Sequence, residues 1–124
     1  MIFKSFVPFM TALMILASLA HAGQADVMNV DVQISADGTY RFDVTVQHAD
    51  TGWDHYADAF EIVSPKGDVL GTRVLLHPHE TEQPFTRSLS GVNIPEDVKD
   101  VDVRAHDKVH GVGGKVVRVG LPGR

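Results

Sequence analysis

Apolar and polar residues alternate along most of this chain with a period of two, the pattern of half-buried β-strands. The clearest case lies at 39–48, where Tyr40, Phe42, Val44 and Val46 alternate with polar residues. Comparable short runs lie at 27–35, 58–64, 69–76, 84–90, 97–105 and 115–121. No apolar series with helical spacing and useful length follows residue 23. We therefore expect seven strands and no helix in this part of the chain.

Turn residues separate these runs. Asp37-Gly38 follows the first run and is a strong hairpin signal. Pro65 and Gly67 lie between the third and fourth runs, where proline presets φ and glycine accepts a positive φ. Seven short strands with turns about every ten residues predict an all-β fold, an immunoglobulin-like or fibronectin III-like antiparallel sandwich. A small β-barrel is the alternative.

The first 22 residues have the composition of an export signal. Lys4 precedes an apolar stretch, and Ala20-His21-Ala22 has the small-x-small pattern of a signal-peptidase site. The apolar stretch is about 13 residues, shorter than the roughly 20 that span a bilayer as a helix. We expect a cleaved signal peptide at 1–22 and one domain at 23–124. The protein would be periplasmic or secreted, without membrane insertion after cleavage.

Composition narrows the chemistry. The net charge of −5 is spread along the chain, which argues against nucleic acid and anionic lipid as partners. There is no cysteine, so thiolate nucleophiles and cysteine-ligated metals are excluded. Met28 is the one methionine after residue 23, which excludes a methionine-rich copper(I) site.

Strand order places the histidines together. If successive strands are antiparallel, the second, fourth and sixth connections lie at one end of the domain. These connections carry every histidine after residue 23, namely His48, His55, His77, His79, His106 and His110. The connections at the other end carry none. Functional sites on sandwiches are built on such end loops.

His77 and His79 flank Pro78 in the segment HPHETEQ. Residues at i and i+2 of an extended segment point to one side, about 6–7 Å apart at Cβ. Pro78 favours extended backbone at His77, so both imidazoles could reach one ion. We predict that these two histidines are the core ligands of a divalent transition metal, copper or zinc. The alternative is that Pro78 merely ends a strand and both histidines are solvated.

His55, His106 and His110 are the candidates for the remaining coordination positions. Metal-bound imidazoles usually donate their second N–H to an acceptor, and Asp54 or Asp107 could take that role. The alternative for the 106–110 segment is a polar hairpin loop.

Three further side chains belong to the same loops. Trp53 and Tyr56 either fill the end of the core or form the wall of the site. His48 continues the inward parity of 40–46, so we expect a buried, hydrogen-bonded core histidine rather than a ligand.

These features favour binding over catalysis, because no base-and-nucleophile pair is apparent. Ser88 and Ser90 lack the G-x-S-x-G elbow of serine hydrolases, and no phosphate-binding glycine motif opens a helix. An open coordination position could still support redox or hydrolytic chemistry. The rival hypothesis is a metal-free module in which the end loops contact another exported protein through their aromatic side chains. Arg87 is expected to be half-buried and paired with Glu80 or Glu82.

The stretches GWDHYAD, LLHPHETEQPFTRSLSGV and VRAHDKVHG resemble a group of small exported bacterial proteins without an assigned activity. The resemblance covers roughly residues 50–118 and transfers no catalytic residue. The expected sandwich is also similar in general shape to the iron domain of superoxide reductases and to sulfur-oxidation carrier subunits. Superoxide reductases use a cysteine ligand, which this chain lacks.

Overall fold

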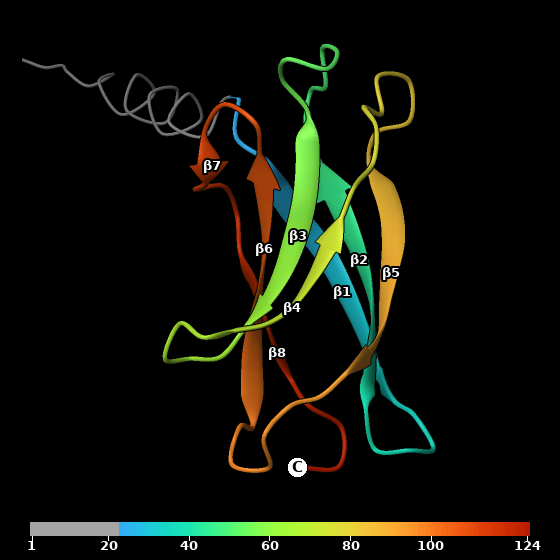
Figure 1. The fold of residues 1–124 in the computed structure, drawn as a ribbon, viewed down its shortest axis with the longest axis vertical. Helices are drawn as coiled ribbons and strands as arrows, with labels where there is room; N and C mark the ends of the chain where they lie inside the picture. The colour runs from blue at the N-terminus through green and yellow to red at the C-terminus, as the bar shows by residue number, and fades with distance from the viewer. Residues whose placement is uncertain (1–22) are drawn as a thin grey trace, which may run out of the picture.

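The computed structural model describes residues 23–124, which form two antiparallel β-sheets packed face to face (Figure 1). The signal peptide expected at 1–22 lies outside the described residues. Among the residues that are described, there is no helix long and apolar enough to cross a membrane. The chain is an all-β sandwich, as the alternation predicts.

The two sheets divide the strands unevenly. The smaller sheet has the order β1-β2-β5, and the larger has the order β4-β3-β6, with β6 also pairing with β7 and β8. The strand bounds are β1 Asp26–Ile34, β2 Tyr40–Gln47, β3 Ala57–Val63, β4 Val69–Val74, β5 Phe85–Val92, β6 Asp100–Asp107, β7 Gly111–Val112 and β8 Val117–Gly120. In the constant-type immunoglobulin domain the fourth strand belongs to the sheet of the first two. Here β4 pairs with β3 instead.

The core fills the space between the sheets. Along β2 the expected alternation is complete, because Tyr40, Phe42, Val44 and Val46 are all buried. The facing sheet contributes buried side chains at alternate positions of β3 and β6, namely Phe60, Ile62, Val101, Val103 and Ala105. This alternation fixes the register, because a one-residue slip would turn each apolar set toward solvent.

Two boundaries differ from the sequence-based expectation. β6 runs from Asp100 to Asp107 rather than over 97–105. His106 and Asp107 therefore belong to the strand and not to the connection that follows it. A short eighth strand, β7, was not predicted, because two residues give no periodic signal. Backbone pairing of Asp107 with Gly111 makes the 108–110 segment a tight hairpin.

The connections alternate between the two ends as expected. Figure 1 shows the β2–β3, β4–β5 and β6–β7 connections at the upper end of the sandwich, and the β1–β2, β3–β4 and β5–β6 connections toward the opposite end. The upper connections carry His48, His55, His77, His79 and His110, and His106 lies at the upper end of β6. We call this the histidine end.

A core substitution should confirm this packing. Phe60 is fully buried, so Phe60→Ala removes apolar burial and leaves a cavity, and should lower the free energy of unfolding by about 3–5 kcal/mol. Urea denaturation monitored by Trp53 fluorescence or circular dichroism measures the change. Val74→Ala is the control, since Val74 is 59% exposed and its truncation should cost far less. Equal losses for the two variants would contradict the assigned core.

Candidate metal centre

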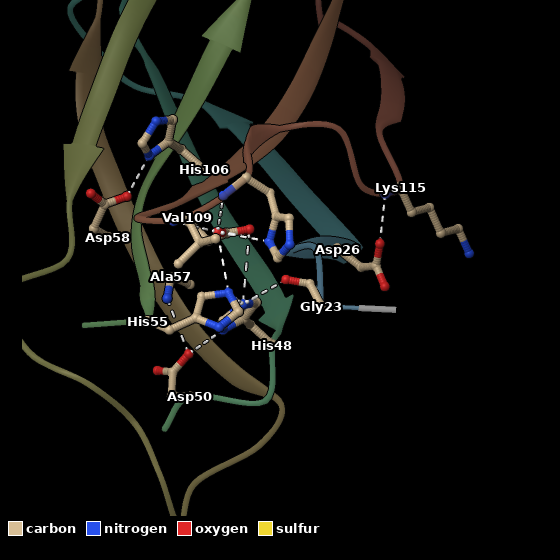
Figure 2. Close-up of polar contacts among 12 residues, drawn as sticks. Gly23, Asp26, His48, Asp50, His55, Ala57, Asp58, His106, Val109 and Lys115 are labelled. Carbon is tan, nitrogen blue, oxygen red and sulfur yellow. Dashed lines mark hydrogen bonds and ion pairs between the residues drawn. The ribbon is translucent and has the colours of Figure 1, made fainter. Parts of the chain in front are cut away.

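Three side chains converge at the histidine end, from both sheets of the sandwich. His48 follows β2, His55 lies in the β2–β3 connection, and Asp107 is the last residue of β6. Each offers one ligand atom, and these atoms all lie within 4.8 Å of one another. Figure 2 shows the imidazoles of His48 and His55 directed toward each other. We call this set the His48–His55–Asp107 group.

Strand parity positions two of its members. His48 is two residues past Val46 and shares its inward direction, and it is 2% exposed. Asp107 is two residues past the buried Ala105 and is fully buried. His55 comes from a compact turn in which its N–H donates to the Gly52 carbonyl at 3.3 Å. The site is therefore built by continuing two core strands beyond the apolar core.

The distances within the group are short. His48 Nε2 lies 3.1 Å from His55 Nε2, and His55 Nε2 lies 3.4 Å from Asp107 Oδ1. His48 Nε2 is 3.9 Å from Asp107 Oδ2. Two imidazole nitrogens at 3.1 Å need either a shared proton or a shared cation between them, because two lone pairs repel.

Asp50 holds His48 in place. Its Oδ1 accepts from His48 Nδ1 at 2.6 Å, and both side chains are fully buried. The backbone N–H groups of Ala57 and His79 also donate to this carboxylate, at 3.0 and 2.7 Å. His48 therefore carries a proton on Nδ1 and turns Nε2 toward His55. A carboxylate behind an imidazole is the usual support for a metal-binding histidine.

Asp107 is held as a charged carboxylate. Burial raises the pKa of Asp107, whereas the backbone N–H groups of His110 and Val109 lower it. The nearby imidazoles of His110 and His48 add to the lowering, and the resulting pKa lies below the ordinary value. Its Oδ1 accepts both backbone N–H bonds, at 2.7 and 2.9 Å. Its Oδ2 is buried and has no hydrogen-bond partner among the described residues.

His110 lies beside this group. Its Nδ1 is 3.2 Å from Asp107 Oδ1, and its ring centroid is 5.1 Å from that of His55. Its side chain is 35% exposed, whereas that of His55 is 24% exposed. His110 is therefore a partly exposed imidazole at the edge of the group.

His77 and His79, the expected core ligands, lie outside the His48–His55–Asp107 group. Their rings are adjacent, with centroids 4.6 Å apart, as their i, i+2 spacing predicts. The Nε2 atom of His79 is engaged elsewhere, however. Arg87 donates to Nε2 at 3.0 Å, and the ring stacks on Phe85 at 4.0 Å between centroids. His77 is exposed, with Nδ1 3.2 Å from the Pro78 carbonyl oxygen.

Arg87 occupies the Nε2 atom of His79. The guanidinium also donates to Glu82 at 3.1 Å, which confirms the expected pairing of this half-buried arginine. An imidazole that accepts from arginine carries its proton on Nδ1, and this Nδ1 is buried without a partner among residues 23–124. Burial lowers the pKa of His79 below 6.5, and the charges of Arg87 and His77 lower it further. His79 is a neutral structural histidine.

His106 points away from the group. It occupies the strand position between the buried Ala105 and Asp107, so its side chain emerges on the opposite face of the sheet. There it pairs with Asp58, with 2.5 Å between Nδ1 and Oδ1. The parity of β6 therefore places His106, a candidate ligand in the sequence analysis, outside the His48–His55–Asp107 group.

The remaining predicted residues differ in their exposure to solvent. Asp54 is exposed and has no hydrogen bond or ion pair within the described part of the chain. Tyr56 is 8% exposed and fills the end of the core, while Trp53 is 64% exposed and contacts the Tyr56 ring edge-on at 5.7 Å. Of the two expected acceptors, Asp107 belongs to the His48–His55–Asp107 group and Asp54 does not.

His48 is buried and hydrogen-bonded, as its inward parity predicts. The sequence analysis did not place His48 or Asp50 among the candidate site residues, although both lie at the His48–His55–Asp107 group. The sequence did contain a signal, since a histidine followed two residues later by an aspartate matches an imidazole with its acceptor. The hydrogen bond between His48 and Asp50 spans that spacing.

The buried His79 should make stability depend on pH. An unfolded chain protonates this histidine near its ordinary pKa of 6.5, whereas the folded chain does so only at lower pH. Its contribution to stability is therefore complete above pH 6.5 and is lost as the pH falls. The free energy of unfolding, measured in chelator, should fall more steeply between about pH 7 and about pH 5 for the wild type than for His79→Gln. His77→Gln is the control and should keep most of the wild-type slope, because burial, the largest cause of the lowered pKa of His79, is unchanged; a wild-type slope for His79→Gln would contradict this assignment.

Among known proteins, this chain is similar to a protein of Halomicrobium mukohataei named "Putative lipoprotein", with 43% identity over 96 residues. The alignment covers 77% of this chain and 47% of that protein, so the chain spans about half the length of the relative that it matches. No family model matches the sequence, and no solved structure matches it. Lipoproteins are exported proteins, so this likeness agrees with the export expected from residues 1–22. The relative's name assigns no activity, in keeping with the resemblance to exported proteins of unassigned activity.

Proposed function

We propose that this protein is an exported metal-binding protein that holds one divalent transition-metal ion, copper or zinc, at the His48–His55–Asp107 group. The observation that carries the proposal is the convergence of three ligand atoms within 4.8 Å of one another, from segments far apart in the sequence. Two imidazoles and one carboxylate form a donor set that suits zinc(II) and copper(II), and iron(II) as well.

The spacing of the donors supports a shared ion. Ligand atoms bound at about 2.0–2.1 Å in tetrahedral or octahedral geometry lie about 2.8–3.4 Å apart. The His48–His55 nitrogen pair at 3.1 Å and the His55–Asp107 pair at 3.4 Å fall in that range. His48 Nε2 lies 3.9 Å from the other carboxylate oxygen, Oδ2, so the Asp107 carboxylate faces both imidazoles.

The electrostatics also favour a cation. Asp107 is fully buried and its pKa is lowered, so it is a carboxylate at neutral pH. Its Oδ2 has no hydrogen-bond partner within residues 23–124, and a buried acceptor without a partner is costly. A metal ion would satisfy this oxygen and would replace the proton between the two imidazoles.

Access to the ion would come through the side of His55 and His110. Their side chains are the partly exposed ones, whereas those of His48, Asp50 and Asp107 are fully buried. His110 would serve as the fourth ligand, since its ring already contacts the group. This arrangement fits uptake, storage or delivery of an ion, and we propose a binding function rather than turnover.

The rival function, a metal-free interaction module, has one observation in its favour. Trp53 is 64% exposed and Leu76 is 76% exposed, and both lie in connections of the histidine end. Exposed tryptophan is a frequent anchor of protein–protein interfaces. This surface is compatible with a metal site beside it, so a contact with another exported protein would add to metal binding instead of replacing it.

Removal of a ligand should abolish tight binding. The untagged protein, purified without chelator, should carry about one equivalent of zinc or copper, whereas His55→Ala and Asp107→Asn should bind the same ion at least about tenfold more weakly. Elemental analysis and chelator competition measure both quantities. His77→Ala is the control, because His77 lies at the same end but outside the group, and it should bind like the wild type. Less than about a tenth of an equivalent of any metal, with no thermal shift on adding either ion, would exclude the proposed function.

Loss of the Asp50 carboxylate, which supports His48, should weaken metal binding almost as much as loss of a ligand. Asp50→Asn removes the charged acceptor behind His48 and should weaken metal binding by about 10–100-fold. Asp54→Asn is the matched control, since that carboxylate is exposed and contacts none of the ligands. Thermal denaturation in chelator should accompany both measurements, because Asp50 also accepts two backbone N–H bonds. Wild-type affinity in a folded Asp50→Asn variant would show that the imidazole needs no such support.

A further inference from the structure

The beginning of the described chain lies in the candidate metal centre. The carbonyl oxygen of Gly23 is 3.1 Å from His48 Nε2, the nitrogen that faces His55 (Figure 2). A Cβ added to Gly23 would lie 3.0 Å from Cε1 of His110 and 3.5 Å from its Nε2. Gly23 is thus packed between two of the histidines that surround the proposed ion.

The position of Gly23 is fixed by the residues after it. Ala25 and Val27 are 1% and 0% exposed, and the N–H of Val27 donates to the Lys115 carbonyl at 2.9 Å. A Cβ added to Gly114 would lie 2.0 Å from the Ala25 carbonyl oxygen, so only glycine permits this close approach. From Ala25 onward, the chain is therefore held in the sandwich by burial and backbone hydrogen bonding.

The sequence pattern of an export signal ends immediately before Gly23. Ala20-His21-Ala22 predicts cleavage immediately before Gly23. Before cleavage, the nitrogen of Gly23 is a peptide N–H, which has no lone pair to offer a metal ion. After cleavage it is an amine, which has one, and it turns freely about the bond between Cα and the carbonyl carbon.

We propose that cleavage completes the metal centre, with the new α-amino group and the carbonyl oxygen of Gly23 joining the ion held by His48, His55 and Asp107. The inference rests on the proposed function. The amine and its own carbonyl oxygen can close a five-membered chelate ring, with the two atoms about 2.7 Å apart, given standard backbone dimensions. The new α-amino group, with an ordinary pKa of about 8, gives up one proton to water when its nitrogen binds the ion. No other bond breaks, apart from the peptide bond that the signal peptidase hydrolyses with water.

This arrangement links metal loading to export. The uncleaved chain presents the three side-chain ligands and a carbonyl oxygen, while the mature chain presents an additional amine. The mature form should therefore bind the ion more tightly than any form in which the Gly23 nitrogen is still an amide. Tight binding would then arise only after the leader has been removed.

The test compares two N-terminal forms of the chain 23–124. One form has the free amine of Gly23, released from a fusion by a protease that cuts immediately before it, and the other is the same chain acetylated at that amine. Dissociation constants for Zn²⁺ and Cu²⁺ are measured by chelator competition. We expect acetylation to weaken binding at least about tenfold, as for the loss of a group that supports a metal site. Intact mass of the exported protein should show that the chain starts at Gly23.

His55→Ala, made in both N-terminal forms, separates this inference from the proposed function. Equal affinity of the acetylated and free forms, with weaker binding of His55→Ala in each, would overturn the inference and leave the proposed function standing. No binding by any form would overturn both, and an exported chain that starts elsewhere would overturn the inference.

A spectroscopic measurement guards against misfolding of the acetylated form. Electron paramagnetic resonance of the copper(II) form with ¹⁵N-glycine should differ in its ligand hyperfine pattern from the unlabelled protein, because the amine nitrogen of Gly23 coordinates. An unchanged pattern would show that no glycine nitrogen binds the ion and would overturn the inference.

Discussion

Burial of two carboxylates controls how the histidine end is built. Asp50 and Asp107 are among the few buried charged side chains, and a buried charge is costly unless hydrogen bonds and opposite charges compensate it. Asp50 accepts N–H groups from the start of β3 and from the β4–β5 connection, and Asp107 accepts two from the β6–β7 hairpin. Compensation of each charge therefore fixes the path of the loops around it. The imidazoles of His48, His55 and His110 occupy the space that these loops enclose.

The fold could be predicted from the sequence because the core imposes a period of two on the strands that form it. The inward positions of β2 and β6 are apolar and the outward ones polar. The presence of these strands, and the side to which each side chain points, could therefore be predicted from the sequence. Antiparallel order then placed the histidines at one end. The two-residue strand β7 and the pairing of β4 with β3 were not readable, because neither depends on a local pattern.

The membership of the site was harder to predict, because it depends on where loops turn and on what each imidazole nitrogen contacts. His77-Pro78-His79 has the more conspicuous motif, yet Arg87 engages one nitrogen of His79 and Phe85 covers its ring. Both neighbours come from β5, and no spacing within the motif reveals them. Asp107 and His106 could have been separated by extending the parity of Val101, Val103 and Ala105 by two residues. That extension places the carboxylate inward and the imidazole outward.

One consequence of the topology concerns how the two sheets are joined. His48 continues β2 in the smaller sheet, and Asp107 ends β6 in the larger one. In antibody domains the second and sixth strands of the sandwich are tied by a disulfide. This chain has no cysteine, and an ion held by His48 and Asp107 would form its cross-link between the same pair of strands. The ion would then act as a removable cross-link, which forms only when the two sheets are packed together. A chelator would remove it without a change in redox state.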